Sequence, residues 1–73
     1  MSAEVARELA NTRLVEAIEA LPAALRLVFV LRYVQKMPRK EIASRLRISV
    51  EEVEDRLTRA LVMCRKRMGD EVG

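Results

Sequence analysis

The sequence predicts an all-α domain made of four helices. Apolar residues recur at intervals of three and four in successive segments, which is the spacing of one helix face. No segment alternates polar and apolar residues for long, and the β-branched residues are scattered, so no strands are expected. Pro22 and Pro38 divide the chain where a new helix can begin, because proline is well tolerated in a first helical turn. The 73 residues are therefore expected to form one small domain, 1–73.

The first two helices are predicted over residues 3–21 and 23–35. The first carries a loose apolar stripe, formed by Val5, Leu9, Leu14, Ile18 and Leu21. The second is apolar nearly all round, which is typical of a helix at the centre of a core. We therefore expect Phe29 and Tyr33 to pack inside the domain.

The last two helices are predicted over residues 38–46 and 49–68. The shorter one places Ile42, Ala43 and Leu46 on one side. The longer one begins with Ser49, and Glu52 follows three positions later, which is the pattern of a capping box. Its inward face is predicted to consist of Val53, Leu57, Ala60, Leu61, Cys64 and Met68. Gly69 is expected to end this helix and to leave residues 69–73 as a frayed tail.

Two short helices joined by the turn "RIS" form a helix-turn-helix without a wing, whose second helix would be the recognition helix, 49–68. Ala43 is small where the two helices would cross. Arg47 occupies the turn position where glycine is usual, and a left-handed conformation there costs about 1–2 kcal/mol. By apolar spacing alone, an ordinary helical hairpin remains the alternative.

Composition excludes several classes of protein. The single cysteine cannot form an internal disulfide, and the absence of histidine removes the common zinc spacings. No set of nucleophile and base is evident, so we expect neither an enzyme nor a cofactor or metal. No apolar run approaches the ~18 residues of a membrane span, and no signal pattern opens the chain, so we expect a cytoplasmic protein with no membrane partner. The net charge of +3 permits nucleic-acid binding without demanding it.

One block of residues resembles a known family. Its landmarks are Leu21-Pro22, Arg26, Val28-Phe29, Leu31, Glu41-Ile42-Ala43, Ile48-Ser49, Val53 and Arg59-Ala60. The block resembles region 4 of extracytoplasmic-function (ECF) RNA polymerase sigma factors. Val53-Glu54 and "RALVMC" give a weaker likeness to the iron-starvation (ferric-citrate) branch. Lys36, Pro38 and Arg47 depart from the more usual Gly, Ser and Gly, which puts the turn geometry in question rather than the family.

The resemblance implies a domain that recognises the −35 promoter element in double-stranded DNA and docks on the β flap of RNA polymerase. It places base-reading positions on Glu54, Asp55, Thr58 and Arg59. Phosphate contacts are expected from Arg39, Lys40, Arg45, Arg47, Ser49 and Arg56. Val30 and Val34 are candidates for the surface that meets the polymerase flap or an anti-sigma factor. Because sigma region 2 is missing, we expect an excised domain rather than a stand-alone protein.

The predicted recognition helix opens with four carboxylates, at Glu51, Glu52, Glu54 and Asp55, although DNA is a polyanion. One interpretation is helix stabilisation, because acids favour a helix N-terminus and because Glu52–Arg56 and Asp55–Arg59 are i,i+4 pairs. The other is base reading, since a carboxylate can accept a hydrogen bond from cytosine N4. A sigma-like module that binds polymerase, an anti-sigma factor or itself without reading DNA is the alternative function. Other helix-turn-helix regulators leave the Leu-Pro and Phe block unexplained.

Overall fold

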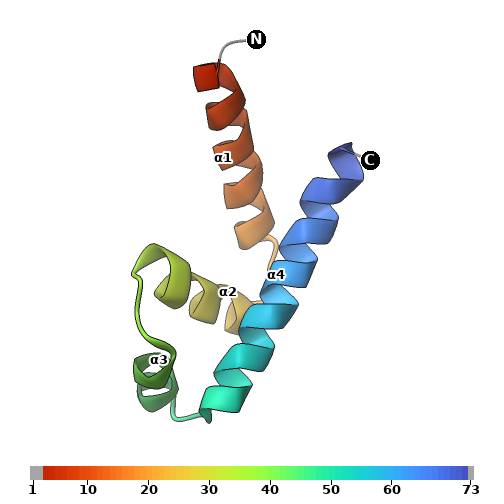
Figure 1. Ribbon diagram of the computed structural model, residues 1–73. Coiled ribbons are helices and arrows are strands. Elements are labelled where there is room, and N and C mark those ends of the chain that lie inside the picture. Colours follow the sequence, from red (N-terminus) through yellow and green to blue (C-terminus); the bar gives the residue numbers. More distant parts are fainter. Residues whose placement is uncertain (1–2, 73) are drawn as a thin grey trace.

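The structure is a computed structural model that describes residues 3–72, and these residues contain helices and no strand (Figure 1). The elements are α1 (Ala3–Glu19), α2 (Ala23–Phe29), the π-helical turn η1 (Val30–Val34), α3 (Arg39–Leu46) and α4 (Val50–Val72). The predicted all-α class is confirmed.

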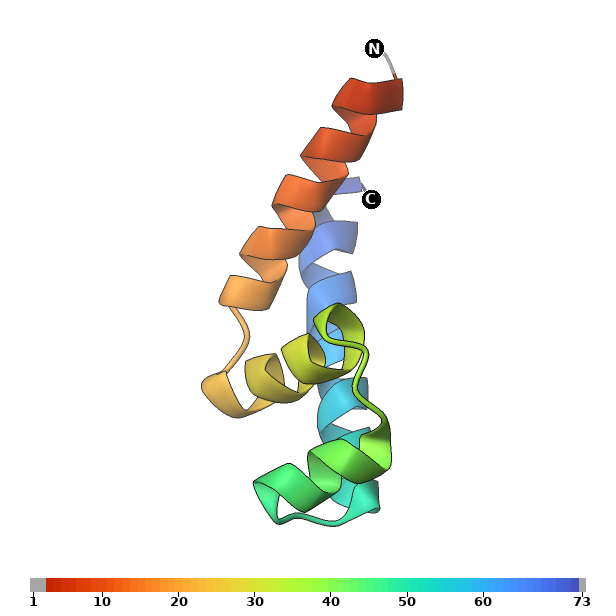
Figure 2. The same ribbon diagram turned by 90° about the vertical axis from the view of Figure 1, so that its left-hand side faces the viewer.

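Helix α4 is the central helix of the domain, because α1, α2 and α3 all pack against it. Figures 1 and 2 show α3 beside the first turns of α4, α2 across its middle, and α1 diverging from its last turns. Both described ends of the chain therefore lie at the same end of the molecule, which measures 45 × 21 × 15 Å. This arrangement leaves the recognition half of α4 at the opposite end.

The core consists of two clusters that α4 joins. The cluster at the helix-turn-helix is formed by Val28, Met37, Ile42, Ala43, Val53 and Leu57. The cluster beneath α1 is formed by Ala17, Leu21, Phe29, Ala60 and Cys64. Neighbouring residues of α2, Val28 and Phe29, enter different clusters, which explains why that helix is apolar nearly all round.

The predicted inward face of α4 is confirmed at Val53, Leu57, Ala60 and Cys64, which are all buried. Leu61 was expected on the same face but is 41% exposed. It lies one turn after Leu57, at the edge of an open pocket whose lining also includes Tyr33 of η1 and Arg39 of α3. The side chain of Met68 lies outside the described residues.

Helix α1 ends at Glu19, two residues before the predicted end, and the buried Leu21 anchors the chain ahead of Pro22. The predicted apolar stripe is buried or half-buried only near the C-terminal end of α1, at Ile18 and Leu21. Leu14 is 37% exposed, because α1 leaves the surface of α4 towards its N-terminus. The side chains of Val5 and Leu9 lie outside the described residues.

The second predicted helix is interrupted by a wider turn. After Phe29 the backbone changes to π-helical bonding, in which the N–H of Gln35 donates to the carbonyl of Val30 at 3.1 Å. Lys36 then takes a left-handed conformation with φ of 57°, and the chain returns to bury Met37 in the cluster at the helix-turn-helix.

Helix α4 continues through Gly69 to Val72, so the predicted helix end near Met68 and the frayed tail after it are wrong for residues 69–72. Gly73 lies outside the described residues. Glycine within a helix costs about 1 kcal/mol relative to alanine, but it lacks the steric block of proline. No helix within residues 3–72 has the length and apolar character needed to cross a lipid bilayer.

Candidate nucleic-acid interface

The predicted helix-turn-helix is formed by α3, the turn 47–49 and the first half of α4. Arg47 adopts the left-handed conformation, with φ of 57° and ψ of 45°. The N–H of Ile48 donates to the carbonyl of Ala43 at 3.1 Å, which is the long-range bond of a Schellman motif. The half-buried Ile48 packs against the cluster at the helix-turn-helix, so the turn is held by both a hydrogen bond and an apolar contact.

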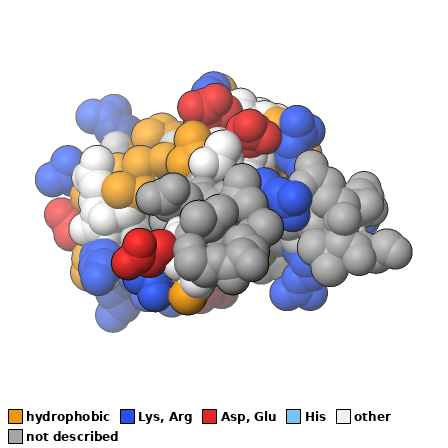
Figure 3. Space-filling view, turned by 90° about the horizontal axis from the view of Figure 1, so that it is seen from above, with side chains coloured by type: hydrophobic (Ala, Val, Ile, Leu, Met, Phe, Trp, Pro, Cys, Tyr) orange, Lys and Arg blue, Asp and Glu red, His pale blue; other side chains and the backbone are white. Residues whose placement is uncertain are grey.

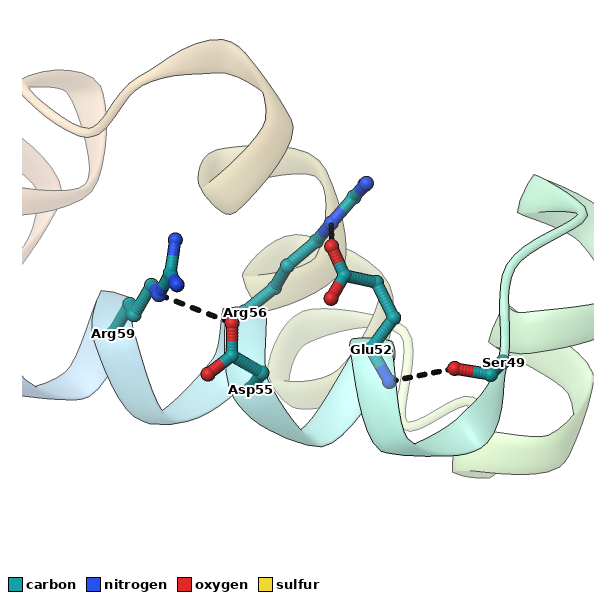
Figure 4. Close-up of polar contacts among 5 residues, drawn as sticks. All are labelled: Ser49, Glu52, Asp55, Arg56 and Arg59. Atoms are coloured by element: carbon teal, nitrogen blue, oxygen red, sulfur yellow. Dashed lines mark hydrogen bonds and ion pairs between the residues drawn. The ribbon is translucent and has the colours of Figure 1, made fainter.

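The start of α4 is capped as predicted, because the hydroxyl oxygen of Ser49 accepts a hydrogen bond from the backbone N–H of Glu52 at 3.0 Å (Figure 4). The carboxylate of Glu52 contacts the Nε of Arg56 at 3.2 Å. The acid that would complete a capping box therefore supports an arginine one turn further along the helix.

The four predicted base-reading residues are all exposed, but the structure divides them into two pairs. Asp55 and Arg59 form an ion pair, with 3.0 Å between Asp55 Oδ2 and Arg59 Nε (Figure 4). Glu54 and Thr58 instead line an open pocket of about 240 Å³. The other residues of this pocket are Tyr33, Arg39, Leu57 and Leu61.

The predicted phosphate-binding residues surround α3 and the start of α4. Arg39, Lys40 and Arg47 are exposed and take part in no ion pair among the described residues. Arg45 is exposed and lies 3.6 Å from the carboxylate of Glu41, and Arg56 is half-buried in its pair with Glu52. Three free cations at the two ends of α3 are therefore the part of this set best placed for a polyanion.

Tyr33 is a residue of this interface that sequence reasoning missed. It was expected in the core, but it lies at the surface, with its ring centroid 4.8 Å from that of the buried Phe29. The wider π turn changes the direction of every side chain after Phe29, so helical spacing alone could not place it. Tyr33 thereby forms the wall of the pocket opposite Glu54 and Thr58.

Of the two residues predicted for a partner surface, Val34 of η1 is 64% exposed, whereas Val30 is half-buried. Figure 3 shows hydrophobic side chains at the surface on the side where α2 and η1 project. In the same turn the Nε of Arg32 is buried and has no hydrogen-bond partner among the described residues, although its guanidinium carbon lies 5.9 Å from the Tyr33 ring centroid.

The remaining chemistry of the described residues is plain. Burial raises the pKa of the Cys64 thiol, which fits the predicted role of a small core residue. Among the side chains that the structure describes, no group of three or more acidic, cysteine or histidine residues is arranged to hold a metal ion.

Comparison with known proteins identifies the family. A family model described as "Sigma-70, region 4" matches residues 11–64, about three quarters of the chain, and covers the helix-turn-helix and both core clusters. A search of curated proteins found no match. The match, together with the turn at Arg47 and the cap at Ser49, shows that this chain belongs to the sigma-70 region 4 family.

Proposed function

We propose that this domain reads the −35 promoter element in duplex DNA and docks on RNA polymerase for transcription initiation. The observation that carries the proposal is the left-handed turn at Arg47, which joins α3 to an α4 whose exposed side carries Asp55, Thr58 and Arg59. In a helix-turn-helix the second helix enters the major groove while the first crosses the backbone. Membership of the sigma-70 region 4 family supports the same assignment. DNA and polymerase as partners imply an activity in the cytoplasm.

The finer assignment to the ECF group draws support from two backbone positions. Lys36 and Arg47 stand where the ECF pattern more usually has glycine, and both adopt φ of 57°. Each non-glycine residue accepts a conformation that costs about 1–2 kcal/mol. The backbone at both positions therefore has the positive φ that glycine would adopt, although neither residue is glycine. The proposed iron-starvation branch depends only on the residues around Val53 and Cys64.

DNA binding would divide into two kinds of contact. The free cations Arg39, Lys40 and Arg47, with Arg45, Ser49 and Arg56, would position the domain on phosphates and carry no sequence information. Arg59 would read guanine, and the carboxylates of Glu54 and Asp55 are suited to cytosine N4. Because these carboxylates repel phosphates, affinity for arbitrary duplex should lie near the weak end of the usual range, about 10⁻⁴–10⁻⁶ M.

The polymerase flap would contact η1 at Val34, with Tyr33 and Arg32 beside it. The exposed apolar side chain of Val34 suits a partner that presents an apolar residue. An anti-sigma factor could use the same surface. These observations also favour the second candidate function, a module that binds protein without reading DNA.

Selection from a pool of random duplexes tests the proposal, with the domain fused to a sigma region 2. We expect recovery of an upstream motif, and we expect Arg59→Ala to relax the preference at one base pair, at a cost of about 1–3 kcal/mol on the true site. Arg56→Ala should lower the binding affinity for all DNA sequences by the same factor. Arg26→Ala, which removes an exposed cation from α2, is the control that should leave the motif intact.

If the wild-type fusion recovers no motif but still binds polymerase core, the protein-interaction function is correct. Recovery of a motif that survives Arg59→Ala unchanged would place base reading elsewhere on α4.

A further inference from the structure

Both ion pairs on the described part of α4 have the same residue spacing and end on the same arginine atom. In each, an acid lies four residues before an arginine and contacts its Nε atom, at 3.2 Å for Glu52–Arg56, where the Nε–H also donates a hydrogen bond, and at 3.0 Å for the ion pair Asp55–Arg59. Figure 4 shows that both contacts end on the guanidinium nitrogen nearest the side-chain stem. The acids thus contact the inner edge of each guanidinium.

This geometry leaves the outer edge of Arg59 available. An arginine has five N–H donors, and only one of them belongs to Nε. The two terminal nitrogens of Arg59 take part in no hydrogen bond among the described residues, and the side chain is 69% exposed. A pair of terminal nitrogens can contact guanine O6 and N7 together, which is the commonest specific contact in the major groove. Guanine reading by Arg59 therefore does not require its ion pair to break.

We infer that Asp55 is a positioning residue for Arg59, an inference that rests on the proposed reading of DNA by α4. The Nε contact limits the directions that the flexible arginine can adopt before binding. Holding a side chain in its bound orientation reduces the entropy lost on binding. In the groove the carboxylate also keeps a cationic partner, so it does not face the phosphates as an unpaired charge.

The structure separates Asp55 from Glu54, although the sequence suggested one role for both. Glu54 takes part in no ion pair among the described residues and lines the pocket with Thr58 and Tyr33. Its carboxylate forms no ion pair with Arg39, the arginine that lines the same pocket. Loss of Asp55, and not of Glu54, should therefore weaken the reading of guanine by Arg59.

The pairing can be tested in the 73-residue protein without DNA. Hydrogen exchange at the Nε–H of arginines, followed by NMR, should be slower for Arg59 than for the exposed and unpaired Arg47. Asp55→Ala should remove this protection, and Asp55→Glu should restore it, because glutamate at the same spacing also reaches arginine. Equal exchange at Arg59 and Arg47 in the wild-type protein would overturn the inference while leaving the proposed function intact.

The effect on DNA reading is tested at the guanine whose preference is lost in Arg59→Ala. Duplexes with guanine or 7-deazaguanine at that position are compared, because the analogue pairs normally but lacks the N7 acceptor. Asp55→Ala should reduce the preference for guanine by about fivefold or more, within the range expected for a bidentate contact. The double variant Asp55→Ala/Arg59→Ala should lose no more of the preference for guanine than Arg59→Ala alone.

Glu51→Ala is the matched control, because Glu51 is an exposed acid in the first turn of α4 with no ion pair among the described residues. It should raise affinity for random duplex as much as Asp55→Ala does and keep the preference for guanine. If Asp55→Ala behaves as Glu51→Ala does in both respects, Asp55 is only a surface charge and the inference is refuted. If Arg59→Ala changes the preference at no base pair, the proposed base reading fails and the inference fails with it.

Discussion

Replacement of Leu57 by alanine should remove a large part of the stability of this domain. Leu57 is 3% exposed and packs in the cluster at the helix-turn-helix with Ile42, Val53 and Met37. Truncation of a buried leucine leaves a cavity and costs about 2–5 kcal/mol, depending on how far the neighbours relax. For 73 residues, a typical stability is about 4–11 kcal/mol. The variant is therefore expected to lose between about a fifth and all of its stability.

Leu61→Ala provides a matched control on the same helix. Both substitutions change leucine to alanine in the middle of α4, so helix propensity changes equally. Leu61 is exposed at the edge of a pocket, and its truncation should cost less than about 1 kcal/mol.

Equilibrium unfolding in urea, followed by far-ultraviolet circular dichroism, gives both values, because the described fold is helical throughout. A shift of the midpoint at constant slope reports stability alone. Equal losses for Leu57→Ala and Leu61→Ala, or a loss below about 1 kcal/mol for Leu57→Ala, would refute the phase of α4 described above.

Three other predictions follow from the turns, the cap and the buried thiol. Lys36→Gly and Arg47→Gly should each stabilise the domain by up to about 1 kcal/mol, because glycine adopts positive φ without steric strain; a lowered urea midpoint would contradict the left-handed assignment. Ser49→Ala should cost about 0.5–2 kcal/mol by leaving the Glu52 N–H without its acceptor, and Ser49→Thr should recover most of this loss in the same assay. Cys64 should react slowly with an alkylating reagent until the protein unfolds, since burial raises the pKa of its thiol; its contribution to stability is complete below the ordinary thiol pKa of about 8.5 and is lost as pH rises beyond it. Rapid alkylation of the folded protein would show that the thiol is accessible.

Local features of the sequence correctly predicted the central motif. A cap at Ser49 and the ion pairs Glu52–Arg56 and Asp55–Arg59 join residues three or four positions apart, so helical spacing alone specifies them. The buried face at Val53 and Leu57 follows from the same periodicity. The sequence put the turn geometry at Arg47 in question, and the structure shows that this residue adopts the left-handed conformation.

The tertiary structure decided how far each periodic face is covered. Leu14 and Leu61 have the correct spacing for burial, yet both are exposed: α1 diverges from α4 around Leu14, and Leu61 faces an open pocket although Ala60 and Cys64 beside it are buried. Spacing identifies which residues share a face, whereas burial depends on where another element ends. The ends of α1 and α4 differ from prediction, because α1 ends three residues before Pro22 and α4 continues through Gly69.

The division of the candidate site was also a tertiary result. The sequence suggested one set of base-reading residues, formed by Glu54, Asp55, Thr58 and Arg59. In the structure, Glu54 and Thr58 line a pocket with Tyr33 of η1, whereas Asp55 and Arg59 form an ion pair. Tyr33 lines this pocket because a π turn redirects it towards α4, and nothing in the apolar pattern of α2 indicates where such a turn occurs. The sequence by itself predicted the cap and the ion pairs at the start of α4, since these join residues within one turn. Only the tertiary structure decided which charges stand alone and which share a surface, because α3 packs against α4 and brings Arg39 to the pocket that Tyr33 and Glu54 also line.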